Sequence, residues 1–71
     1  MPPERKNTHR LSLDTIAGMN SLFGSVTHAY DVLRLGHSAI DMRRFRAACA
    51  HLPVTFDEMT AIESAWERWQ E

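Results

Sequence analysis

The sequence predicts an all-α protein that folds as a compact four-helix single domain. Apolar residues recur at the three- and four-residue spacing of amphipathic helices almost throughout residues 11–71, and they do not alternate as they would in a strand. Glycine, proline and capping residues divide this pattern into four segments. A chain of 71 residues is long enough for one small hydrophobic core.

Residues 1–10 precede the helical pattern, and we expect them to form a flexible basic arm outside the helical domain, which covers residues 11–71. They contain two prolines and no apolar periodicity, and Arg5, Lys6 and Arg10 make them basic. Such an arm can be a solubilising tail, or it can become ordered on an acidic protein surface or in a nucleic-acid groove.

The first two helices are predicted over residues 12–23 and 26–35. Ser12 is the expected N-cap of the first helix, and Gly24 is expected to end it. The second helix begins almost directly afterwards, so the two helices must cross at a steep angle. Gly36 is predicted to end the second helix in the left-handed conformation that glycine favours.

The third helix is predicted to restart at Ser38, the expected N-cap with Asp41 three residues on, and to end before Pro53. Its buried side is expected to hold Met42, Phe45, Cys49 and Leu52. Its opposite side combines arginines with small apolar residues: Ile40, Arg43, Arg44, Ala47, Ala50 and His51. This composition would let a partner approach the helix closely, although alanine is also the best helix former and can stand there for that reason alone.

The segment Thr55-Phe56-Asp57-Glu58 has the pattern of a capping box, in which Thr55 and Glu58 close each other's open backbone amides. The fourth helix therefore begins here. Its Trp66 is predicted to close the core, whereas Trp69, near the end of the helix, is expected to be partly exposed and is a candidate contact residue. Glu63 and Glu67 are expected to face water.

Charge is distributed unevenly, although the net charge is only −1. Residues 1–52 carry seven Lys and Arg against four Asp and Glu, whereas residues 53–71 carry one against five. Dedicated DNA-binding domains are usually clearly basic, so this division favours a protein target over DNA.

The sequence contains no pattern typical of an enzyme, and we expect no catalytic residue, no cofactor and no metal. The single Cys49 lies on the apolar side of a predicted helix, which indicates an inert thiol, and the four histidines lack metal-ligand spacing. No phosphate loop, dinucleotide fingerprint or nucleophile elbow is present. The lone cysteine, together with the lack of a signal peptide or a long apolar run, leads us to expect the cytoplasm of a bacterial host cell.

Two stretches, 23–27 and 35–40, resemble the helix-turn-helix of Cro- and repressor-like phage regulators. This resemblance implies a helix-turn-helix-like core whose second helix, from Ser38, enters the major groove. It would place Ser38, Ala39, Arg43 and Arg44 against bases or phosphates. The sequence departs from the family at Val32, Asp31 and His37, where the family prefers a small residue and two apolar ones.

The small size, the charge division and the basic arm also resemble the very small proteins that lytic phages make to bind host RNA polymerase. This resemblance implies a phage-type transcription regulator that acts by inhibition, by antitermination or by both. The alternatives are a Cro- or repressor-like DNA-binding regulator and an antirepressor-like module that binds another regulator.

The expected partners are bacterial RNA polymerase or another transcription protein, with DNA in the alternative; no membrane and no small-molecule substrate is expected. The expected partner-binding residues are Arg5, Lys6, Arg10, Ser38, Ala39, Ile40, Arg43, Arg44 and Ala47.

Overall fold

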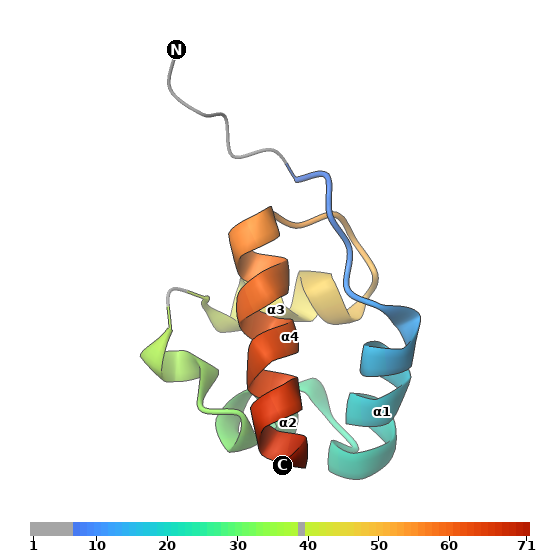
Figure 1. Ribbon diagram of the computed structural model, residues 1–71, viewed down its shortest axis with the longest axis vertical. Coiled ribbons are helices and arrows are strands. Elements are labelled where there is room, and N and C mark those ends of the chain that lie inside the picture. Colours follow the sequence, from blue (N-terminus) through green and yellow to red (C-terminus); the bar gives the residue numbers. More distant parts are fainter. Residues whose placement is uncertain (1–6, 39) are drawn as a thin grey trace.

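Four α-helices surround one core in the computed structural model, which describes residues 7–38 and 40–71 (Figure 1). The elements in chain order are α1 (Leu13–Phe23), α2 (Val26–Val32), the short 3₁₀ helix η1 (Leu35–His37), α3 (Met42–Cys49) and α4 (Phe56–Gln70). The long α4 runs through the middle of the view with α1 to one side, and α3 crosses behind it. The predicted all-helical, four-helix fold is confirmed.

Both ends of α1 follow the sequence prediction. The Ser12 side chain accepts a hydrogen bond from the Asp14 amide at 3.2 Å, which satisfies one of the open amides of the first turn. Gly24 ends the helix at φ 79°, a left-handed conformation that costs glycine little, and its amide donates to the Asn20 carbonyl.

The capping box at the start of α4 is also confirmed. The Glu58 amide donates to Thr55 Oγ1 at 3.2 Å, and the Thr55 amide donates to Glu58 Oε1 at 3.0 Å. These reciprocal bonds fix the start of α4 at Phe56.

The core draws side chains from every helix and from the segments between them. Phe45 and Ile62 are fully buried, and Trp66 is 7% exposed, as predicted for the residue that closes the core. The ring of Trp66 stacks on that of Trp69, with 5.8 Å between centroids, and Phe23 meets it edge-on at 6.0 Å. The buried hydrophobic residues are Leu11, Ile16, Met19, Ala29, Leu33, Leu35, Ile40, Phe45, Ala48, Val54, Ile62, Ala65 and Trp66.

The predicted environments of Leu52, expected in the core, and Glu63, expected to face water, are wrong. Leu52 is 52% exposed, because the chain has already left α3 at Cys49 and turns at His51 with φ 63°. Glu63 does not simply face water: it accepts hydrogen bonds from Thr15 Oγ1 at 2.6 Å and from the Ser12 amide at 3.0 Å. Glu63 therefore connects α4 to the N-terminus of α1.

The connection between α2 and α3 differs from the predicted tight turn at Gly36. The second helix ends at Val32, and Arg34, not Gly36, adopts the left-handed conformation at φ 56°. η1 then buries Leu35, and Asp41, not Ser38, is the N-cap of α3: its side chain accepts the Arg44 amide at 2.8 Å. Nine residues therefore separate two helices that a helix-turn-helix joins by three or four.

Part of the segment predicted to be a flexible arm lies against the domain. His9 and Val54 pair their backbones as an isolated antiparallel bridge, with N–O distances of 3.0 and 2.7 Å. Arg10 Nε donates to the His51 carbonyl at 3.2 Å. Residues 7–10 therefore belong to the folded domain.

Candidate partner-binding surface

The exposed side of α3 carries two arginines followed by two alanines. Arg43 and Arg46 are exposed, Ala50 directly after the helix is exposed, and Ala47 is half-buried between them. These positions follow the i, i+3, i+4, i+7 spacing of one helix face. We call the four residues the α3 face: Arg43, Arg46, Ala47 and Ala50.

The α3 face is held outward by the burial of the opposite side of the helix. Phe45 and Ala48 are completely buried, and the Phe45 ring lies 5.7 Å from that of Tyr30 on α2. The Tyr30 hydroxyl donates to the Ile40 carbonyl at 2.5 Å, which fixes the chain just before α3 begins. The buried side is thus centred between Phe45 and Ala48, not between Phe45 and Cys49 as expected.

Arg44 lies between α3 and α4, where its side chain forms an ion pair within the domain. Its Nε and Nη2 donate to the two carboxylate oxygens of Glu58, each at 2.7 Å, and Nη2 also donates to Asn7 Oδ1 at 3.0 Å. This bidentate ion pair lowers the pKa of Glu58 to about 2 and raises the pKa of Arg44. Arg44 is only one-third exposed, so its predicted place on the free side of the helix is wrong.

The other predicted contact residues are scattered. The Ile40 side chain is 3% exposed and belongs to the core, so it offers a partner no surface and its predicted place is wrong. The Ser38 hydroxyl donates to the Leu35 carbonyl at 2.7 Å, within its own turn. Arg10 is exposed but lies beside His51, outside the α3 face. Arg5, Lys6 and Ala39 lie outside the described residues.

Arg46 is exposed beside Arg43, although it was not among the expected partner-binding residues and was expected to contact phosphates only if the target were DNA. Its signal was available, since it lies three residues after Arg43 and one turn before Ala50. The choice between Arg44 and Arg46 depends on whether Ala48 or Cys49 marks the centre of the buried side. Ala47, Ala48 and Cys49 are consecutive and all small, so the apolar pattern does not show which of them faces the core.

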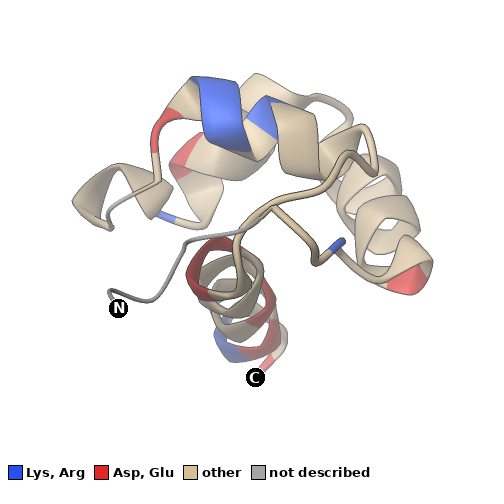
Figure 2. Ribbon diagram, turned by 90° about the horizontal axis from the view of Figure 1, so that it is seen from above, with Lys and Arg blue, Asp and Glu red and all other residues tan. Residues whose placement is uncertain are grey.

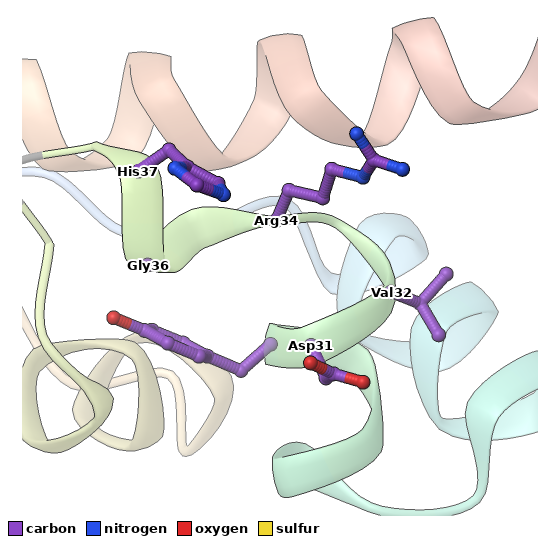
Figure 3. A pocket seen from close by; sticks show the side chains of 6 residues that line it. Asp31, Val32, Arg34, Gly36 and His37 are labelled. Atoms are coloured by element: carbon purple, nitrogen blue, oxygen red, sulfur yellow. The ribbon is translucent and has the colours of Figure 1, made fainter.

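A polar cavity of about 510 Å³ lies between α2 and η1. In Figure 3 the side chains of Arg34 and His37 lie on one side of the turn, and Asp31 lies on the other. Its lining is more polar than apolar and includes exposed Asp31, Arg34 and His37, in contrast to the largely apolar pockets that bind small molecules.

Chemically reactive groups are few in the described part of the chain. Burial raises the pKa of the Cys49 thiol to about 11, so the thiol stays protonated near neutral pH and is a poor nucleophile. Across residues 7–38 and 40–71, no three His, Cys, Asp or Glu side chains are grouped so that they could hold a metal ion. Among the described helices, none has the length and apolar character needed to cross a bilayer.

No protein-family model, no curated protein and no solved structure matches this chain.

Proposed function

We propose that the protein is a small transcription regulator that binds bacterial RNA polymerase through the α3 face. The observation that carries this proposal is the pair of exposed arginines, Arg43 and Arg46, on a helix that contains no acidic residue. Ala47 and Ala50, which follow them on the same face, have side chains too small to project far from the helix. An acidic protein surface can therefore approach both guanidinium groups without first displacing bulky side chains.

A protein target fits the geometry better than a DNA groove. A recognition helix contacts base edges with its N-terminal residues, but Asp41 stands at the N-terminus of α3 and would bring a carboxylate towards the phosphates. Arg44 is held by Glu58, which leaves one fewer arginine for phosphate contacts. The nine-residue connection before α3 also lacks the compact turn of a helix-turn-helix.

Polymerase is proposed as the partner because of the general resemblance to small polymerase-binding phage proteins. The physical part of the proposal is narrower: the target offers an acidic surface to the α3 face. Opposite charges on the two surfaces would speed association and orient the complex, and high salt would slow association.

Retention of polymerase on immobilised protein from a nuclease-treated bacterial lysate, followed by binding to purified polymerase, tests the proposal. Arg43→Glu with Arg46→Glu is expected to weaken binding on the order of tenfold to a hundredfold, because two cations become anions at the interface. Arg34→Glu with Arg68→Glu is the matched control: it changes the net charge equally at exposed positions outside the α3 face and should bind normally.

Three outcomes would contradict the proposal. Polymerase could be absent after nuclease treatment, both double variants could bind alike, or the protein could instead shift short duplex DNA tightly with a steep loss of affinity as salt rises. The last result would favour the DNA-binding alternative, since release of counterions from phosphates gives that salt dependence. Capture of another transcription regulator without polymerase would favour the antirepressor-like alternative.

A further inference from the structure

The exposed side of α4 has the opposite character to the α3 face. Asp57, Thr60, Ser64, Glu67 and Glu71 are all exposed and recur at helical spacing along α4 and its C-cap; we call these residues the α4 face. Thr60 and Ser64 lie between Asp57 and the Glu67–Glu71 pair, so small side chains adjoin the charges on this face as they do on the α3 face. Arg68 lies at the edge of this face and is the one basic residue of α4. In Figure 2, α3 crosses the top of the view and α4 is seen nearly end-on below it.

Each face holds a pair of like charges close together, and Arg43, Glu67 and Glu71, unlike Arg46, also lie at the end of their helix where the dipole disfavours their charge. Glu67 and Glu71 are four residues apart, so they repel each other, and they lie at the C-terminal end of α4, where the helix dipole favours cations. Arg43 lies in the first turn of α3, where the dipole favours anions, and it is three residues from Arg46. A surface of opposite charge would relieve the repulsion on either face.

The spacing of the two charged pairs also matches. Side chains three or four residues apart on a helix have Cβ atoms about 5–6 Å apart. Arg43 and Arg46 can therefore each meet one carboxylate of the Glu67 and Glu71 pair at the same time. The two helices already form one such contact inside the molecule, where Arg44 of α3 binds Glu58 of α4 with both oxygens at 2.7 Å.

We propose that the α3 face binds the α4 face of a second copy of this chain, head to tail. The charged residues of both faces are exposed in a single molecule, and a pair of bound copies leaves one α3 face and one α4 face free for further copies. A net charge of −1 leaves little overall repulsion between copies. Exposed ion pairs are weak, so this association is reversible and sensitive to salt.

Self-association would cover the face that the proposed function assigns to polymerase, and this regulatory consequence rests on that proposed function. The α4 face of a second copy and the acidic surface of polymerase would then compete for the same α3 face. The physical association does not depend on that function, because it involves the purified chain alone. Either proposal can therefore fail without the other.

Sedimentation velocity of the purified full chain over a range of concentrations tests the proposal. In about 50 mM salt, where charges act over more than 10 Å, the average sedimentation coefficient should rise with concentration, and in about 1 M salt this rise should disappear. Arg43→Glu with Arg46→Glu should abolish the rise, and so should Glu67→Lys with Glu71→Lys. Asp14→Lys with Asp31→Lys raises the net charge as much as the Glu67 and Glu71 reversal does and should retain the rise. Arg34→Glu with Arg68→Glu lowers it as much as the Arg43 and Arg46 reversal does and should retain the rise as well.

Mixing the two charge-reversed variants gives the decisive result. In the mixture the unaltered α3 face of the lysine variant can bind the unaltered α4 face of the glutamate variant, and the two charge-reversed faces can bind each other. The equimolar mixture should therefore associate although neither variant does so alone. Circular dichroism should show unchanged helicity for both. A wild-type chain that stays monomeric in low salt overturns the proposal. Association that survives either reversal, or a mixture that stays monomeric, overturns it as well.

Discussion

At the scale of single residues, Gly18 sets how closely α1 approaches α4. A Cβ atom at this position would lie 2.7 Å from Cζ2 and 3.3 Å from Cη2 of the Trp66 ring. That ring is buried and stacked on Trp69, so it cannot move aside easily. Propensity alone would make alanine better than glycine inside a helix by about 0.5–1 kcal/mol. Here the steric conflict should outweigh that gain.

We therefore expect Gly18→Ala to lower the free energy of unfolding by about 1–3 kcal/mol, as overpacked cores do. Urea denaturation followed by circular dichroism measures this. Asn20→Ala, at an exposed position of the same helix, is the control and should leave stability equal or slightly higher. In a Trp66→Phe background, whose smaller ring leaves space, the penalty of Gly18→Ala should shrink. An equally large penalty in both backgrounds would show that the ring contact is not the cause.

At the scale of helices, the Arg44–Glu58 pair joins α3 to α4 and makes stability depend on pH. The pKa of Glu58 is about 2 in the folded chain against 4.5 for an ordinary glutamate, because Arg44 stabilises its charged form. A lowered folded pKa stabilises the fold fully above pH 4.5, and this contribution is lost as the pH falls from 4.5 through about 2.

Glu58→Gln separates the ion pair from the capping box, since glutamine can still accept the Thr55 amide. Wild-type protein should be more stable than this variant at pH 7 by about 1–2 kcal/mol, and the difference should disappear near pH 2. Urea midpoints at several pH values measure the gap, with Glu67→Gln at an exposed position as the control. A gap that is the same at pH 7 and pH 2 would rule out the ion pair as its source.

The sequence predicts those helix ends that local chemistry determines. Ser12, Gly24 and the Thr55–Glu58 capping box act within one turn of the chain, so their residue types are sufficient. The α2–α3 connection depends instead on distant packing. Both Leu33 and Leu35 are buried, and residues two apart cannot share one face of an α-helix, so the chain leaves α2 early and forms η1.

The N-cap of α3 also depends on packing between distant parts of the chain. Ser38 and Asp41 are both good capping residues, and local preference does not separate them. Ile40 is buried in the core before α3 begins, so the helix starts after this residue and Asp41 is its N-cap. Arg43 and Ala47 lie on the side of α3 away from the core, as the sequence predicts. Ile40 is buried in the core, and Arg44 is partly exposed but bound to Glu58 of α4, so neither position could be predicted from α3 alone.

At the scale of the whole molecule, so small a core depends strongly on its largest side chain. Trp66 contacts Phe23 of α1 and Trp69 of α4, and its ring also fills the space beside Gly18. A domain below about 70–80 residues rarely gains more than about 3–5 kcal/mol from a single core. Truncation of a buried tryptophan to alanine costs about the same amount.

Trp66→Ala should therefore leave the chain largely unfolded at 25 °C, with loss of helical circular dichroism and of a cooperative thermal transition. Trp69→Ala is the matched control, because Trp69 belongs to the same stack but is 43% exposed. Less apolar area is lost from the interior in this variant, so it should stay helical and melt at a lower temperature than wild type. If Trp66→Ala melted like wild type, or if the two variants were equally damaged, the stability of the domain would not be centred on the α1–α4 contact.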